Sequence, residues 1–498
     1  MCANKTSNDY TDMNMVLIKQ IIDVIIEPFT YICNLSFISG IFPDCMKIAK
    51  VIPLFKKGNK SEFSNYRPIS LLPQFSKILE KLFAIRLNKF FNEFKILSNS
   101  QYGFRPNHST ATAIMELTEE ITNAIDKKHY LVSIFVDLQK AFDTLDHKIL
   151  LHKLYKYGIR GVAHQWVTSY LKNRSQFVEI DNIKSKNCSI TCGVPQGSVL
   201  GPILFLLYVN DIVSVSQLLR CILFADDTTL FYSGKNIKDV LQIVENEFQK
   251  IMKWFNANRL SLNISKTKFM IFCSKKKYVE TSLFINGLEI ERAHVIKFLG
   301  IMIDEHLTWK SHIDNIKVKV SQIIGVLHKV KDYLNKNALF LLYNSLIVPY
   351  LTYCIEVWGS ACKTYINPIL FLQKRAIRVI SGSGYRDSTN PLFIQLKTLK
   401  FNELVEYNLL KTMYKAHLES LPNNLQNRFT KRKSRYELKG TEVFTKPRFQ
   451  SAVKEKCVTI KGVSLWNSLD CKIKTSKSIY VFKKYVKLSM LLKYNTAE

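Results

Sequence analysis

Three aspartates stand where a folded chain could bring carboxylates together. Asp137 ends the apolar run 131–136, and Asp226 and Asp227 lie at the predicted tip of a strand–turn–strand segment, 221–232. Carboxylates that meet in a fold repel one another, and a hard divalent cation such as Mg²⁺ or Mn²⁺ relieves that repulsion. Two such ions about 4 Å apart can activate an attacking oxygen and stabilise a leaving phosphate oxygen. Taken alone, each aspartate is better explained as a turn or cap residue.

The elements that must position these aspartates follow from hydrophobic periodicity and turn residues. Strands and helices alternate up to about residue 303 and helices follow, which predicts a mixed-sheet domain and then a helical one. The expected strands or extended segments are 66–72, 131–136, 221–232, 269–272 and 298–303, and the expected helices are 15–29, 76–91, 140–157, 198–211, 237–255 and 313–334. Pro28 is expected to stop the first helix. A Gly/Pro loop at 193–197 is expected to lead into the helix at 198.

The composition points to an acidic partner. The chain of 498 residues carries 71 Lys and Arg against 40 Asp and Glu, a formal net charge of +31. Such an excess persists most naturally when a polyanion neutralises it, so nucleic acid is the favoured partner. An anionic membrane surface is the alternative, disfavoured because the cations are spread along the chain instead of forming one basic amphipathic helix.

Several protein classes are excluded at this stage. A hydrophobic content of 47% is enough to bury cores, so the chain is not wholly disordered. We expect no membrane-spanning segment, because no uninterrupted apolar run of about 18 residues occurs. We also expect no secretory signal, and neither a disulfide framework nor a zinc site, since no C-x-x-C pair is present.

The densest basic stretch is 428–448. Its cations are Arg428, Lys431, Arg432, Lys433, Arg435, Lys439, Lys446 and Arg448. The stretch is explained equally well as a phosphate-binding segment and as a solvated linker.

Eight short blocks occur in an order that resembles the motifs of reverse transcriptases, most of all those of non-LTR (LINE-type, jockey-like) retrotransposons. Three resemble fingers motifs: P-L-F-K-K-G (53–58), N-Y-R-P-I-S-L-L (65–72) and Q-Y-G-F-R-P (101–106). Five resemble palm motifs: F-V-D-L-Q-K-A-F-D (135–143), G-V-P-Q-G-S-V-L-G-P (193–202), F-A-D-D-T (224–228), L-N-I-S-K-T-K (262–268) and F-L-G-I (298–301). Weaker similarity extends over 21–49 and 346–359.

The resemblance implies a right-hand polymerase of the α/β (α+β) class with a mixed or antiparallel catalytic sheet. It implies a helical extension over 1–50, fingers and palm over 51–303, a helical thumb over 304–385 and a basic C-terminal region of uncertain fold over 386–498. The implied activity is RNA-directed DNA polymerisation with two Mg²⁺ or Mn²⁺ ions, using template RNA, primer or target DNA and dNTPs. An intracellular protein that acts in the nucleus is implied, with no membrane partner. Because only about fifty residues precede the fingers, we expect an endonuclease supplied in trans or a longer reading frame.

The resemblance also assigns roles around the aspartates. Asp137, Asp226 and Asp227 would hold both ions, with the Leu138 carbonyl as a further ligand. Lys266 would protonate the departing pyrophosphate, although a solvated lysine is the better explanation without the resemblance.

Further residues would bind the substrates. Phe142 would close the sugar pocket against a 2′-hydroxyl, with a core position on a helix as the alternative. The triphosphate would be held by Lys56, Lys57 and Arg67, and the sugar or template would lie against Gln196 and Gly197. Contacts to nucleic acid are expected from Arg105, Lys317, Lys331, Lys431 and Arg432, where plain solvation is about as good an explanation for the thumb lysines.

Two other functions stay open. A defective or domesticated copy of such an element would bind RNA without polymerising. An RNA-dependent RNA polymerase is disfavoured, because those enzymes tend to place a polar residue at the position of Phe142.

Overall fold

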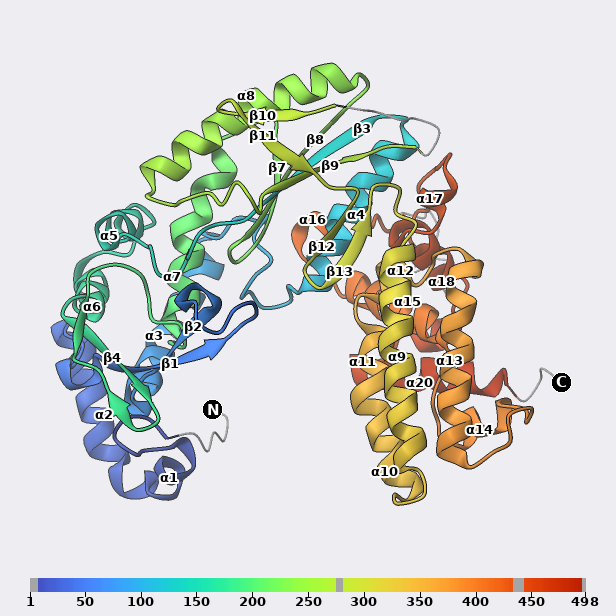
Figure 1. The fold of residues 1–498 in the computed structure, drawn as a ribbon, viewed down its shortest axis with the longest axis horizontal. Coiled ribbons are helices and arrows are strands. Elements are labelled where there is room, and N and C mark those ends of the chain that lie inside the picture. The colour runs from blue at the N-terminus through green and yellow to red at the C-terminus, as the bar shows by residue number, and fades with distance from the viewer. Residues whose placement is uncertain (1–7, 275–280, 433–442, 495–498) are drawn as a thin grey trace. The chain divides into compact units, whose positions relative to one another are not determined.

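The structure, a computed structural model, describes residues 8–274, 281–432 and 443–494 (Figure 1). The chain divides into two compact units, each built from separate stretches of sequence. The first unit comprises 1–104, 136–228 and 246–267, and the second comprises 105–135, 229–245 and 268–498. Each unit is described by itself below.

The first unit combines helices with a small sheet of five strands. Its helices are α1 (Met15–Gln20), α2 (Ile22–Ser39), α3 (Gln74–Glu93), α5 (His147–Lys156), α6 (Gly161–Leu171) and α7 (Leu200–Val209). The sheet has the order β2 (Tyr66–Leu71), β1 (Ile48–Phe55), β4 (Arg174–Ile180) and β5 (Ile183–Lys184), and β6 (Cys188–Ile190) also pairs with β4. Strand β1 is antiparallel to β2 and parallel to β4, so the sheet is mixed.

A second sheet has the strand order β10-β11-β9-β3-β8-β7. Its members are β3 (Tyr130–Val136), β7 (Arg220–Phe224), β8 (Asp227–Gly234), β9 (Lys268–Phe272), β10 (Leu283–Ile285) and β11 (Leu288–Arg292). Strand β9 is antiparallel to β3 and parallel to β11, so this sheet is mixed as well. All residues of β3 after Tyr130 are buried, as the apolar run predicted, and α8 (Ile237–Ala257) confirms the strongest predicted helix.

The prediction that Pro28 stops the first helix is wrong. The chain forms two helices, and α2 continues through Pro28 to Ser39, where Gly40 at φ +69° ends it. A proline removes one backbone hydrogen bond, but the residues after it are held by tertiary contacts. Ser36 accepts a hydrogen bond from the Trp166 indole at 3.0 Å, and the Phe37 and Trp166 rings lie 5.7 Å apart.

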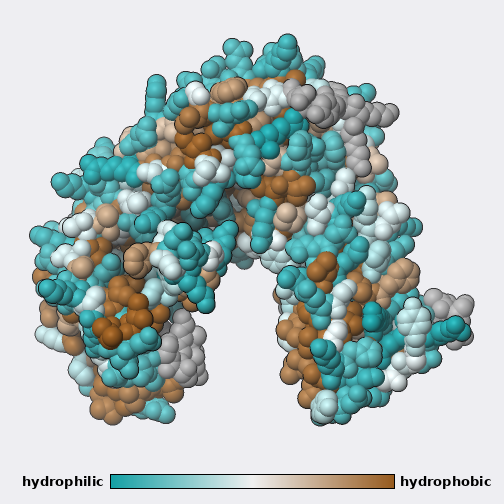
Figure 2. Space-filling view, in the orientation of Figure 1, coloured by the Kyte–Doolittle hydropathy of each residue, from teal (hydrophilic) through white to brown (hydrophobic). Residues whose placement is uncertain are grey.

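Helix α2 is also more apolar on its surface than the sequence analysis anticipated. Val24, Tyr31 and Ile38 are exposed, and hydrophobic side chains gather at the lower left of Figure 2, where Figure 1 places α2. By length and composition alone, α2 could cross a membrane, and little of it is buried; a single helix of this kind is weak evidence. The sequence analysis missed the segment because it ended the helix at Pro28.

The helix predicted over 140–157 begins later, at His147. Asp146 caps it, since its carboxylate accepts hydrogen bonds from the backbone N–H groups of Lys148 at 2.9 Å and Ile149 at 3.0 Å. Residues 137–146 are therefore a non-helical connection. This frees Phe142 and Asp143 from a helix and allows both to face the neighbouring loop.

The strand predicted over 298–303 is in fact a hairpin. Strands β12 (Val295–Phe298) and β13 (Ile301–Asp304) pair with each other across a turn at Leu299 and Gly300. Both turn residues have positive φ, 43° and 91°, the conformation that a two-residue hairpin of this hand requires.

The second unit is mainly helical after residue 304. Helices α9 (Lys310–Val330) and α13 (Lys363–Ser381) pack side by side (Figure 1). The other helices are α4 (Thr110–Asp126), α10 (Lys336–Leu342), α11 (Val348–Thr352), α12 (Ile355–Trp358), α14 (Asn390–Gln395), α15 (Phe401–His417), α16 (Asn423–Gln426), α17 (Ala452–Glu455), α18 (Val463–Asn467), α19 (Cys471–Lys474) and α20 (Ile479–Leu492), with π-helical turns at Tyr343–Ile347 and Val458–Gly462.

Buried ion pairs join α4 to the C-terminal part of the second unit. Lys454 Nζ lies 2.5 Å from Glu119 Oε2, and both side chains are almost completely buried, with 6% and 2% exposed. The hydroxyl and N–H of Thr459 also donate to Glu119. Arg428 pairs with Glu116 and Glu120 on the same helix. Arg428, Lys454 and Thr459 are thus part of the folded core around α4.

We expect Lys454→Met to lower the free energy of unfolding by about 3–5 kcal/mol, because it leaves the Glu119 carboxylate buried without its cation. Adding Glu119→Gln should recover most of that loss, since the amide still accepts from Thr459. Lys317→Met is the matched control, because Lys317 and Asp314 form a solvent-exposed pair at 2.9 Å that contributes about 1 kcal/mol or less. Urea unfolding measures all four proteins, and equal losses for the two lysine variants would contradict the buried-pair assignment.

Candidate active site

Asp226 and Asp227 stand at the tip of the hairpin formed by β7 and β8, as predicted. Ala225 turns the chain there with φ +55°, and both aspartates are exposed while the strand behind them is buried. The hairpin thus presents two carboxylates from a rigid base.

Residues 98–103 support the β7 side of this hairpin. The Tyr102 N–H donates to the Leu223 carbonyl at 2.7 Å, and the Leu223 N–H donates to the Ser100 carbonyl at 2.9 Å. The segment therefore runs parallel to β7 for a short distance.

Gly103 and Gln101 extend that support to the tip. A Cβ on Gly103 would lie 2.5 Å from the Ala225 nitrogen, so only glycine allows this approach. Gln101 Oε1 accepts from the N–H groups of Gly103 at 2.8 Å and Ala225 at 3.4 Å. The sequence analysis did not assign Gln101 a role, although the Q-Y-G-F block contained it.

Asp137 is held through its backbone by the turn that follows α8. Its carbonyl accepts from the Asn263 N–H at 2.8 Å, and its N–H donates to the Thr267 hydroxyl at 3.3 Å. Leu138 lies opposite Leu262 as a non-hydrogen-bonded antiparallel pair. In such a pair the carbonyl points away from the partner strand, as a role for the Leu138 carbonyl in ligand binding requires.

Cations surround the three carboxylates. Lys266 Nζ lies 3.9 Å from Asp137 Oδ2. Lys56 and Arg67 both act to lower the pKa of Asp226, whereas burial and Asp137 raise it more, so that its pKa is above the ordinary value. Burial, Asp226 and Asp137 raise the pKa of Asp227 to about 6. Both side chains reach the solvent, but the protein that surrounds their carboxyl groups makes desolvation the largest cause of both raised pKa values.

The β1–β2 hairpin separates Lys56 from Lys57, a choice that the sequence left open. Leu54 pairs with Arg67 across the two strands, and Lys56, two residues further on, lies on the same face. Its N–H still donates to the Asn65 carbonyl at 2.9 Å. Lys57 lies beyond the end of β1, in the bend that follows it, so this pairing selects Lys56 as the partner of Arg67.

The loop 193–197 lies between this hairpin and Phe142. The Ser70 N–H donates to the Gln196 carbonyl at 2.8 Å, and a Cβ on Gly197, whose φ is +133°, would lie 2.4 Å from the Ser70 carbonyl oxygen. Phe142 is half-buried and stacks on Phe205 of α7 with ring centroids 4.5 Å apart. The predicted nucleotide-binding residues of the first unit thus belong to connected segments.

Glu80 of α3 is a buried support that the sequence analysis missed. Its carboxylate accepts from the N–H groups of Val199 at 2.7 Å and Leu200 at 3.1 Å, which are unpaired donors at the start of α7. Burial raises its pKa, while Arg174 and these hydrogen bonds lower it. The surrounding sequence, K-I-L-E-K-L-F, has lysines on both sides of this glutamate and gave no signal that it would be buried.

The donor set at the hairpin suits hard divalent cations. Among the residues that the structure describes, no group of three or more His, Cys, Asp or Glu side chains is arranged as a formed metal site. The three aspartates nevertheless offer only oxygen donors, and burial together with their mutual repulsion raises the pKa of Asp226 and Asp227. A divalent cation would relieve that repulsion.

The second unit contains the other predicted nucleic-acid-binding residues. Arg105 is half-buried, Lys317 pairs with Asp314, and Lys331 ends α9 exposed. Lys431 pairs with Glu419 at 3.1 Å, and Arg432 is exposed. Arg428 is committed to Glu116 and Glu120, while Lys433, Arg435 and Lys439 lie outside the described residues.

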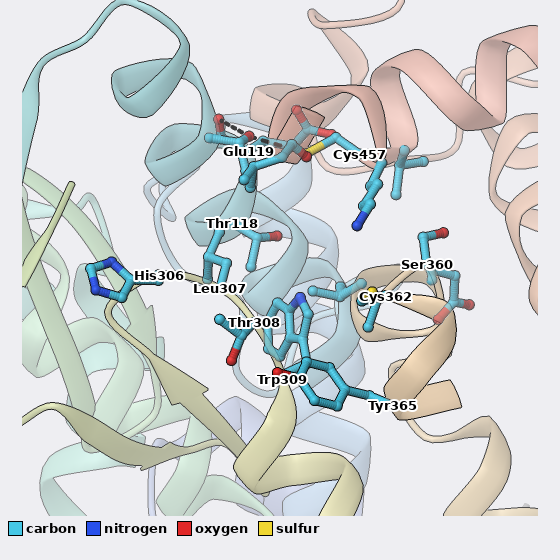
Figure 3. A pocket seen from close by; sticks show the side chains of 17 residues that line it. Thr118, Glu119, His306, Leu307, Thr308, Trp309, Ser360, Cys362, Tyr365 and Cys457 are labelled. Atoms are coloured by element: carbon cyan, nitrogen blue, oxygen red, sulfur yellow. Dashed lines mark hydrogen bonds between the residues drawn. The ribbon is translucent and has the colours of Figure 1, made fainter. Parts of the chain in front are cut away.

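A cavity of about 130 Å³ in the second unit is separate from these residues. Trp309 and Tyr365 lie on one side of it and Glu119 and Cys457 on the other (Figure 3). Of these residues, Glu119 is already paired with Lys454.

Comparison with known families decides what this arrangement belongs to. The family described as "Reverse transcriptase (RNA-dependent DNA polymerase)" matches residues 55–303, half of the chain. The chain belongs to the reverse transcriptase family. The match covers Lys56, Arg67, the three aspartates and Lys266.

Similar proteins come from insect mobile elements. The chain is 32% identical over 365 residues to the "Probable RNA-directed DNA polymerase from transposon BS" of Drosophila melanogaster, covering 69% of this chain and 39% of that protein. It is 29% identical over 398 residues to the "RNA-directed DNA polymerase from mobile element jockey" of the same species, covering 78% of this chain and 43% of that protein. The chain thus spans less than half the length of these relatives.

Among solved structures, the apo telomerase of Candida tropicalis is similar with a TM-score of 0.42 and 13% identity, covering 84% of this chain and 74% of that one. The family match and the two mixed sheets followed by helices confirm the predicted fold class.

We expect Asp227→Asn to raise the melting temperature of the metal-free protein at about pH 8, because it removes a carboxylate whose folded-state pKa is raised to about 6. A raised pKa means that the folded state binds the proton more tightly than the unfolded state. The gain should therefore shrink as the pH falls below about 6 and vanish near the ordinary aspartate pKa of about 4.

Added Mg²⁺ should raise the melting temperature of the wild type more than that of the variant. Asp181→Asn is the control, since Asp181 is an exposed turn residue of the same unit. A lower melting temperature for metal-free Asp227→Asn at about pH 8 would contradict the repulsion argument.

Proposed function

We propose that this protein is the RNA-directed DNA polymerase of a non-LTR mobile element, which adds dNTPs to a primer 3′-hydroxyl on an RNA template. One observation supports it above the others: the three aspartates of a reverse transcriptase motif set lie with Lys56, Arg67 and Lys266 in one unit, and their charges act on one another. The formal net charge of +31 fits a nucleic-acid partner.

In this proposal the hairpin of β1 and β2 binds the incoming nucleotide. Arg67 offers a planar pair of N–H donors that suits a phosphate, and Lys56 adds a point charge on the same face. Both cations face Asp226 closely enough to lower its pKa. A triphosphate held by them is therefore brought beside the carboxylates.

The three aspartates and the Leu138 carbonyl would hold the divalent ions. When bound there, Mg²⁺ or Mn²⁺ would supply charge neutralisation and acidify the primer 3′-hydroxyl. Lys266, whose amine is exposed and 3.9 Å from Asp137, would donate a proton to the departing pyrophosphate. The rest of the rate enhancement would come from positioning.

Phe142 is proposed to form the floor of the sugar pocket. Its stack on the buried Phe205 leaves the ring little freedom to move. A rigid aromatic floor would collide with a 2′-hydroxyl and so favour deoxynucleotides.

The function is tested by primer extension with purified full-length chain, oligo(dT) on poly(rA), dTTP and Mg²⁺. We expect extension by the wild type, none by Asp226→Asn, and none for either after chelation of the metal. RNA binding should survive in Asp226→Asn. Binding of RNA by the wild type without any extension would overturn the proposal in favour of a defective or domesticated RNA-binding protein.

Phe142→Val should lower the dNTP-to-rNTP ratio of kcat/KM roughly 10- to 100-fold, as expected for removal of a steric contact. Phe94→Val is the control, because Phe94 is exposed at the end of α3 in the same unit. Single-nucleotide incorporation with dTTP and UTP gives the ratio, and an unchanged ratio in Phe142→Val would exclude the sugar-pocket role.

A further inference from the structure

The loop 193–197 is fastened to the connection after Asp137 by backbone hydrogen bonds. The Gly193 N–H donates to the Leu145 carbonyl at 2.7 Å, and the Val194 N–H donates to the Phe142 carbonyl at 2.9 Å. The His147 ring also bonds to the Gly193 carbonyl, with Nε2 2.7 Å from the oxygen. These hydrogen bonds fix the position of the loop relative to residues 142–147.

Asp143 is in the closest contact with the loop. Gly193 has φ +79°, and a Cβ there would lie 2.5 Å from the Asp143 carbonyl oxygen. Only a glycine lets the loop lie this close to the Asp143 backbone. The side chain of Asp143 is consequently brought within reach of Gln196.

The two side chains form a hydrogen bond with a defined direction. Gln196 Nε2 donates to Asp143 Oδ1 at 2.9 Å. An ionised carboxylate can only accept, so it selects the NH₂ end of the amide and turns the Gln196 Oε1 away. Burial raises the pKa of Asp143, while the hydrogen bond from Gln196 and the charge of Lys140 favour its ionised form. The Gln196 backbone is held from the other side by the Ser70 N–H at 2.8 Å.

We propose that Asp143 is a positioning residue that sets the polarity of the Gln196 amide, so that Gln196 presents an acceptor oxygen to a sugar hydroxyl of the bound nucleic acid or nucleotide. This rests on the proposed polymerase function. Two hydroxyls have the required chemistry: the 3′-hydroxyl of the incoming dNTP and the 2′-hydroxyl of the RNA template. Without Asp143 the amide can flip and present its NH₂ group instead. The sugar hydroxyl then loses the acceptor to which it would donate.

The test measures nucleotide affinity without requiring chemistry. Full-length protein is bound to a primer that ends in a dideoxynucleotide, on an RNA or a DNA template, and the apparent Kd is measured for dTTP and ddTTP. The proteins are the wild type, Asp143→Asn, Gln196→Ala, the double variant and Asp181→Asn, an exposed control. Melting temperatures verify that each variant is folded.

Asp143→Asn should reduce the preference for the hydroxyl-bearing ligand about two- to tenfold, the range of one neutral hydrogen bond. A change in the dTTP-to-ddTTP ratio identifies the 3′-hydroxyl, and a change in the RNA-to-DNA template ratio identifies the 2′-hydroxyl. In the Gln196→Ala background, Asp143→Asn should change neither ratio, because the residue it positions is gone.

Unchanged ratios in Asp143→Asn, or an equal change in the Gln196→Ala background, would overturn the proposal, as would a wild type that binds no nucleotide. A wild type that binds nucleotide with a hydroxyl preference but fails to extend a normal primer would refute the polymerase function alone, and the assignment of Asp143 would still be decided by the binding ratios.

Discussion

Burial and mutual repulsion disfavour the charged forms of Asp226 and Asp227 beside Asp137, and the first unit must hold these carboxylates in place against that cost. The pKa of Asp227 rises to about 6 because burial and its two neighbours disfavour its charged form. Such an arrangement costs stability in the folded state, so it persists only because the surrounding backbone is strongly fixed. The hairpin tip is supported by Gln101 and Gly103, and Asp137 by the turn at Asn263 and Thr267.

Close approach of backbone segments also shapes the loop 193–197. Gly193 and Gly197 have positive φ and lie against the Asp143 and Ser70 carbonyls, where a Cβ would not fit. Glu80 then uses its buried carboxylate to cap the first N–H groups of α7. The loop is therefore held on both sides and at its end, and the Gln196 side chain is held by its hydrogen bond to Asp143.

The second unit depends on a different interaction, the burial of charge in pairs. Glu116 and Glu120 of α4 pair with Arg428, and Glu119 pairs with Lys454, partners that lie more than 300 positions later in the chain. This explains why part of the basic excess of the C-terminal region is not available to a phosphate backbone. Charge counted along a sequence is an upper bound on charge offered to a partner, because ion pairs remove some of it from the surface.

Local sequence patterns specified much of this protein. The apolar run before Asp137, the hairpin at Asp226 and Asp227, the long α8 and the family motifs all follow from residue order, and the structure and comparisons confirm them. Other features depended on contacts between distant residues. Ser36 and Phe37 pack on Trp166 and stabilise the part of α2 that follows Pro28. The pairing of β1 with β2 places Lys56 on the same face as Arg67. Asp143 meets Gln196, and Glu80 meets α7, only in the folded chain, because hydrogen bonds and ion pairs between remote residues leave no periodic signal in the sequence.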